Sequence, residues 1–155
     1  MIGRLVLAAA ALLALPAVAS AQNADKPIAE AAADLAYGYC PLFLGDQFPL
    51  TGNAALASFG FSEAIDKRQH PRFGEMEMVG AKRPDGELGF GGAKESICQV
   101  VVMGPNRAAA WDMLHKNMAY MGFDFKPVTD ASVPAIPGVT VETFKAPIEN
   151  QFLYV

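Results

Sequence analysis

The chain has 155 residues, of which 52% are apolar and 18% are charged, and its formal net charge is −4. This composition excludes an intrinsically disordered chain. An acidic balance without a run of basic residues argues against nucleic acid and against anionic membrane surfaces as partners.

The first 21 residues have the three parts of a secretory signal peptide. Arg4 supplies a positive charge, an apolar stretch follows from Leu5 to Ala19, and Ala19-Ser20-Ala21 offers the small residues that a signal peptidase accepts. Pro16 interrupts the stretch short of the roughly 20 apolar residues that a membrane-spanning helix needs. We expect cleavage after Ala21, with Ala19 as the alternative, and a periplasmic or secreted protein without a stable membrane anchor.

Cys40 and Cys98 are the only cysteines of the chain. An even number of cysteines in an oxidising compartment predicts a disulfide. It would close a loop of roughly 60 residues, which the chain-entropy model values at about 4 kcal/mol. No Cys-x-x-Cys spacing indicates a redox role, and two separate buried thiols remain the alternative.

A helix is predicted over residues 24–36. Its apolar residues recur at intervals of four, three and four, which draws one stripe: Ile28, Ala32, Leu35 and Tyr39. Gly38 and Pro41 are expected to end it. Residues 41–52 are predicted to be a loop that folds back over the core, because large apolar residues are frequent in it.

Two short helical stretches and a hairpin are expected next. Asn53 is expected to cap a helix that runs to Phe59, and residues 62–69 are predicted to form another helical turn or two. From Phe73 the apolar period changes to two, which indicates a strand. Arg83-Pro84-Asp85-Gly86 is a turn sequence, so residues 87–91 are predicted to return as the second strand.

Residues 96–103 are predicted to form a strand near the middle of the sheet, because both of its faces are mostly apolar. We expect Cys98 to face the first helix from this strand. A second long helix should follow Gly104 and end at Gly122. Its predicted apolar stripe contains Ala110, Trp111, Leu114, Met118 and Met121.

Further strands are predicted over residues 123–126, 139–144 and 151–155, with a proline-containing loop or sheet border over residues 127–138. The order of elements indicates an α+β fold: an antiparallel sheet of about five strands with helices packed against it. Residues 22–155 are expected to form a single globular domain.

The candidate chemical groups are few. His70 and His115 are the only histidines, and neither has a partner at metal-ligand spacing. His70, Met76 and Met78 form a cluster that could bind copper, because thioethers are ligands of Cu(I). Strict alternation with glutamates instead favours inward-facing methionines, so no metal or other cofactor is expected.

Gly89, Gly91 and Gly92 lie in a glycine-rich stretch that lacks the continuation of a phosphate loop. We interpret it as a kinked edge of the sheet, where a ligand or a partner strand could approach the backbone.

The chain contains no Gly-x-Ser-x-Gly motif, and its carboxylate pairs are neighbours on one strand face. We therefore expect a non-enzymatic domain that binds a protein, a peptide or an envelope component. The alternatives are a small secreted hydrolase, with a site assembled around His70 or His115, and a periplasmic copper-binding protein. A histidine that meets a carboxylate and a hydroxyl in a cleft would favour the hydrolase, whereas isolated histidines and an apolar concave surface would favour binding.

Overall fold

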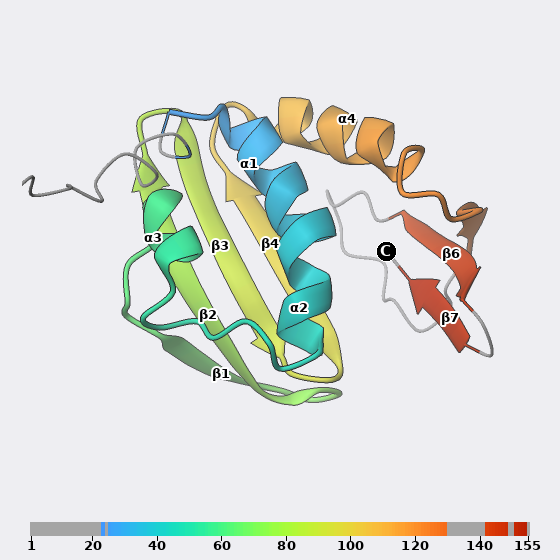
Figure 1. The fold of residues 1–155 in the computed structure, drawn as a ribbon, viewed down its shortest axis with the longest axis horizontal. Coiled ribbons are helices and arrows are strands. Elements are labelled where there is room, and N and C mark those ends of the chain that lie inside the picture. The colour runs from blue at the N-terminus through green and yellow to red at the C-terminus, as the bar shows by residue number, and fades with distance from the viewer. Residues whose placement is uncertain (1–22, 24, 130–141, 149–150, 155) are drawn as a thin grey trace, which may run out of the picture.

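The computed structural model describes residue 23 and residues 25–129, 142–148 and 151–154, and their fold is α+β (Figure 1). The predicted signal peptide lies outside the described residues. Within the described part, no helix has the length and apolar character that crossing a membrane requires. The predicted α+β class is confirmed, and the strands divide between a four-stranded and a three-stranded sheet.

The first helix continues beyond its predicted end. α1 (Ile28–Asp34) passes into a π-helical segment, η1 (Leu35–Tyr39), and then into α2 (Cys40–Leu44). The Cys40 N–H donates to the Leu35 carbonyl oxygen, five residues earlier, which makes a wider turn. Pro41 therefore falls in the first turn of a restarted helix, where the N–H that proline lacks is not needed.

The larger sheet is an antiparallel meander of β1 (Asp66–His70), β2 (Gly74–Arg83), β3 (Gly86–Ala93) and β4 (Ile97–Met103), in that order. The predicted hairpin is confirmed as β2 and β3. The helical turns predicted over residues 62–69 are wrong, because this stretch contributes β1. Its polar residues offer no apolar face for a helix, and Lys67 instead pairs across the strands with Glu75 and Glu77 at 3.2 and 2.6 Å.

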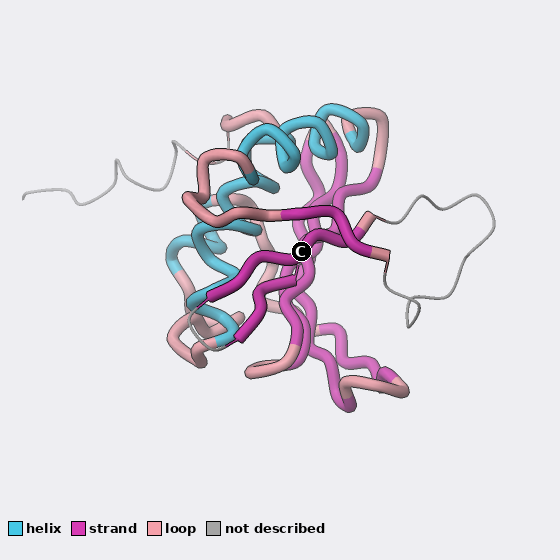
Figure 2. The backbone as a smooth tube through the Cα atoms, turned by 90° about the vertical axis from the view of Figure 1, so that its right-hand side faces the viewer, coloured by secondary structure: helices cyan, strands magenta, loops and turns pink. Residues whose placement is uncertain are grey.

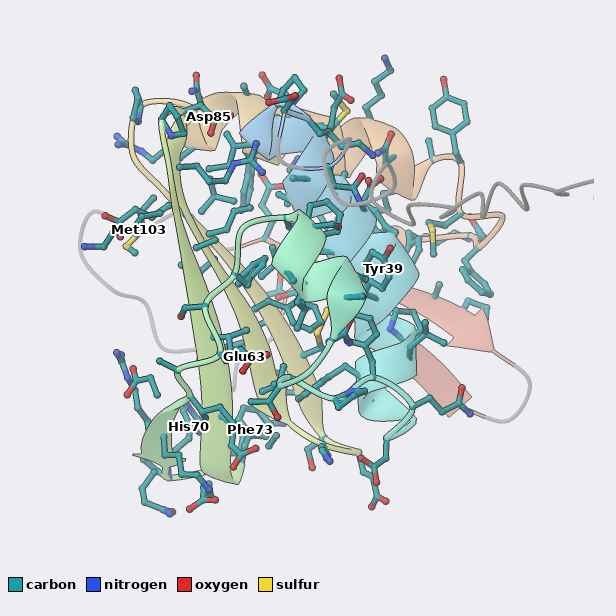
Figure 3. All side chains as sticks on the ribbon, turned by 60° about the vertical axis from the view of Figure 1, so that its left-hand side comes forward. Tyr39, Glu63, His70, Phe73, Asp85 and Met103 are labelled. Atoms are coloured by element: carbon teal, nitrogen blue, oxygen red, sulfur yellow. A yellow bond between two sulfur atoms is a disulfide. The ribbon has the colours of Figure 1, made fainter. Side chains whose placement is uncertain are left out.

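β4 is an edge strand among the described residues, so its predicted place near the middle of the sheet is wrong. β1 adds to the opposite side of the sheet, and the C-terminal strands form a sheet of their own. Only one face of β4 packs against the core. On the other face Val101 and Met103 are 37% and 52% exposed, and Figure 3 shows Met103 on the side away from the helices.

The core lies between the helices and one face of the larger sheet (Figure 2). Phe90 in β3 is fully buried, and three phenylalanine rings meet it edge-on at centroid distances of 5.7 to 6.5 Å: Phe43, Phe48 and Phe61. Phe48 belongs to the stretch predicted as a loop over residues 41–52, of which residues 41–44 are instead part of α2. The remainder folds over the core as expected. α3 (Ala54–Ser58) also packs here, capped by Asn53 as predicted.

A disulfide joins Cys40, at the start of α2, to Cys98 in β4, with the Cα atoms 5.5 Å apart. This confirms the predicted bridge and the prediction that Cys98 faces the first helix. The bond spans 58 residues and fixes the helix against the edge strand.

α4 (Arg107–Met118) confirms the second long helix, but its predicted stripe is only partly buried. Ala110 and Met118 are buried, whereas Trp111 is 41% exposed. The Trp111 ring lies beside the His115 ring on the same helix, at a centroid distance of 4.8 Å.

The smaller sheet has the antiparallel order β5 (Lys126–Val128), β6 (Thr143–Ile148) and β7 (Gln151–Tyr154). The strand predicted over residues 123–126 is thus shifted towards the C-terminus, into the predicted loop. β6 extends beyond the end of the strand predicted over residues 139–144, the first three of which lie outside the described residues. Pro147 lies within β6, at a position where β5 has already ended and where β7 is the one neighbour in the ladder among the described residues. Proline is tolerated there because one side of the strand needs no N–H donor.

Candidate functional site

A groove of about 430 Å³ lies between the first helical segment and the C-terminal end of α4. We call it the tyrosine groove, because three of its eight lining residues are tyrosines. The lining residues are Ala33, Asp34, Tyr37, Gly38, Tyr39, Asn117, Tyr120 and Met121.

The π-helical segment η1 supplies one wall of the tyrosine groove. The Tyr37 hydroxyl donates a 2.7 Å hydrogen bond to the carbonyl oxygen of Leu114, and burial raises the pKa of Tyr37. The Tyr39 ring packs on Phe48 and Phe59, at centroid distances of 4.8 and 5.9 Å. Both tyrosines are therefore held in place by the body of the protein, and Figure 3 shows Tyr39 on the helical side of the sheet.

The other wall of the groove is more exposed. Tyr120 follows α4 and is 78% exposed. Gly122 adopts a positive φ of 73°, which ends the helical path, and Phe123 beyond it is 38% exposed. In the first wall, next to η1, Asp34 forms an ion pair with Lys26. The groove thus presents aromatic surface beside a carboxylate that is already paired.

His115 meets a carboxylate, but outside the tyrosine groove. Its Nε2 lies 2.7 Å from Glu142 Oε2, and its Nδ1 lies 2.9 Å from the Trp111 carbonyl oxygen. Both ring nitrogens face acceptors, so neither offers a lone pair for general-base work in this arrangement. No described hydroxyl hydrogen-bonds to this ring, so a nucleophile–histidine pair is not assembled in the described part of the chain.

His70 lies at the end of the β1–β2 hairpin (Figure 3). Its ring stacks on Phe73 at a centroid distance of 4.8 Å, and its Nδ1 accepts a hydrogen bond from the Arg72 N–H. No carboxylate or hydroxyl of the described residues hydrogen-bonds to this ring. The hydrolase hypothesis therefore gains no geometric support from either histidine.

The copper hypothesis also gains no support. Met76 is only 6% exposed, but it and Met78 lie on the face of β2 opposite Val79 and Ala81, the residues of this strand that pack in the core. The expectation that the two methionines face the core is therefore wrong. Among the described residues no three side chains from histidine, cysteine, aspartate and glutamate gather as a metal site. Copper binding by His70, Met76 and Met78 remains an untested prediction.

Gly89, Gly91 and Gly92 lie in β3, which is paired with β2 on one side and β4 on the other. The interpretation of this stretch as a sheet edge is therefore wrong, and a partner strand cannot add to it. At Gly91 a Cβ atom would lie 2.1 Å from the Glu77 carbonyl oxygen, and the φ of 145° also disfavours side chains. The glycine allows close strand approach. A ligand-binding role for the three glycines remains a prediction, although these glycines do not lie on a free edge of the sheet.

The tyrosine groove was not predicted from the sequence. The sequence Tyr37-Gly38-Tyr39 is a recognisable feature. Whether its tyrosines line a groove, however, depends on the π-helical turn and on the end of α4, which is distant in the sequence. Comparison of the chain with known protein families, with curated proteins and with solved structures finds no match, so the geometry of the chain itself is the basis for assigning a function.

Proposed function

We propose that the protein is a non-enzymatic binding domain, exported to the periplasm or the cell exterior, which recognises another protein, a peptide or an envelope component through the tyrosine groove. The observation that carries this proposal is the groove itself. Its volume of about 430 Å³ falls within the usual range of ligand sites. Tyrosine and methionine are among the residue types that are enriched in protein–protein interfaces.

The groove is also organised in advance. The Tyr37 hydroxyl is anchored on Leu114, and the Tyr39 ring is anchored on two phenylalanines of the core. Binding to a wall that is already ordered loses little side-chain entropy, which favours affinity. Tyr120 is free to settle on a ligand because it is 78% exposed. A fixed wall and an adaptable wall together suit the capture of an apolar or aromatic side chain.

The proposed location rests on two features. The Cys40–Cys98 disulfide is stable in an oxidising compartment, and the first 21 residues have the pattern of a signal peptide. Intact-mass measurement of the protein from a periplasmic extract should give a chain that starts at Gln22. A full-length chain found only in the cytosol would contradict the location.

The binding function is tested with the mature protein immobilised as bait for an envelope extract, followed by mass spectrometry of what is retained. Tyr120→Ala should lower the retention of at least one component about tenfold. Ile65→Ala is the matched control, because Ile65 is a large apolar residue, 36% exposed, that does not line the groove. Equal retention by both variants, or no retained component at all, would contradict the proposal.

A further inference from the structure

His115 connects two elements that are distant in the sequence. It lies on α4, and its ring contacts Glu142, the residue before β6, and Phe144 within β6. The His115–Glu142 contact is 2.7 Å long, and the ring centroids of His115 and Phe144 are 5.6 Å apart. The ring of Trp111 lies against the same histidine from α4. His115 therefore connects α4 to the smaller sheet.

The two groups that contact the His115 nitrogens favour one protonation state of the ring. A backbone carbonyl oxygen and a carboxylate only accept hydrogen bonds, so both His115 nitrogens must donate at the same time. Only the imidazolium cation carries two N–H groups. The Trp111 carbonyl and the Glu142 carboxylate accordingly raise the pKa of His115 above its ordinary value of 6.5, against a smaller opposing effect of burial.

The other charged groups near the ring act in the same direction or point elsewhere. Asp112, on the same helix, adds a weaker attraction for the proton. Lys116 follows His115 in α4 and is therefore rotated by about 100° around the helix axis. Lys145 alternates with Phe144 along β6 and so projects from the opposite face of the strand.

We propose that His115 is a pH-dependent clasp, which holds β6 against α4 while it is protonated and loosens as the proton is lost. Because the folded state raises the pKa, the stabilisation is complete below 6.5 and disappears as the pH rises through the raised value. The smaller sheet should therefore be attached more firmly at mildly acidic pH than at pH 8.5. The side chains of His115 and Glu142 are 34% and 43% exposed, so salt should weaken the clasp.

The test combines two NMR measurements on the mature protein with its disulfide intact. Titration of the His115 ring should give a pKa above 6.5, and Glu142→Gln should lower it. Amide hydrogen exchange in β6, corrected for the intrinsic pH dependence of exchange, should become about three- to tenfold faster between pH 5.5 and pH 8.5. In Glu142→Gln the corrected rates should not depend on pH. His70→Gln is the matched control and should leave both readouts unchanged.

Two results would overturn the clasp. The first is a His115 pKa at or below 6.5 in the wild-type protein. The second is a pH dependence of β6 exchange that persists in Glu142→Gln, which would place its origin elsewhere. Both residues are partly exposed, so the variants should fold, and unchanged exchange in β3 verifies this in the same sample.

Discussion

The region from α1 to β4 and the smaller C-terminal sheet are held by different kinds of contact. The first region is built around Phe90, which is fully buried among other phenylalanine rings, and a disulfide closes it. In the smaller sheet every residue of β5 is exposed, although Ala146 in β6 is fully buried, and a partly exposed ion pair at His115 connects the sheet to α4. Buried apolar surface carries no charge that pH can titrate or salt can screen, whereas an exposed ion pair responds to both. We therefore expect the two regions to lose stability under different conditions.

The largest effect is expected from Gly91→Ala in the first region. The new Cβ atom would lie 2.1 Å from the Glu77 carbonyl oxygen, so the β2–β3 ladder must open or shift. We expect a loss of about 4 kcal/mol or more in the free energy of unfolding, measured with urea. Gly80→Ala is the control, because its Cβ would make an ordinary 3.8 Å contact. Similar stabilities of the two variants would show that strand spacing does not limit this region.

The next effect is expected from removal of the disulfide. Cys40→Ser combined with Cys98→Ser frees a loop of 58 residues in the unfolded chain, which the chain-entropy model values at about 4 kcal/mol before any strain is subtracted. The loss should appear as a lower urea midpoint, with β3 and β4 exchanging faster. Reduction of the wild-type protein should reproduce it. If only the smaller sheet became less protected, the assignment of the disulfide to the first region would be wrong.

The parts of the fold that follow from local pattern could be predicted, and those that depend on distant partners could not. The β2–β3 hairpin was predictable because Pro84 and Gly86 specify a turn between alternating strands. β1 was missed because its polar residues show no period, and only its pairing with β2 makes it a strand. The tyrosine groove was missed because Tyr37 becomes a wall only where the end of α4 meets η1.

The same distinction applies to the edges of the sheet. Apolar residues on both faces of β4 indicated a central strand, although Val101 and Met103 are exposed. The glycines of β3 indicated an edge, although they serve the close approach of two neighbours. Composition alone does not distinguish a strand covered by helices from a strand that has a neighbour on each side. Both properties depend on residues that are distant in the sequence.

The smallest effect is expected at the polar joint between the β2–β3 turn and α1. Asp85 accepts a 2.8 Å hydrogen bond from the Ile28 N–H at the start of α1, and a 3.1 Å hydrogen bond from Arg83 Nε. Asp85→Asn should cost about 2 kcal/mol at pH 7, because charge-assisted hydrogen bonds are lost and the largely buried Arg83 keeps no counterion among the described residues. Asp124→Asn is the control, because this carboxylate is 73% exposed.

The pH dependence of this joint should run opposite to that of the His115 clasp. Burial by itself raises the pKa of Asp85, but the hydrogen bonds from Ile28 and Arg83 outweigh it and lower the pKa below its ordinary value of 3.8. The stabilisation is therefore complete above that value and is lost as the pH falls through the lowered one. Urea unfolding should show the gap between wild type and Asp85→Asn at pH 7 and its narrowing in strong acid. Strong acid thus weakens the hydrogen bonds that hold the start of α1, whereas mild alkali weakens the contact between His115 and Glu142. A gap that stays constant down to the lowest pH would mean that Asp85 acts through its shape and not through its charge.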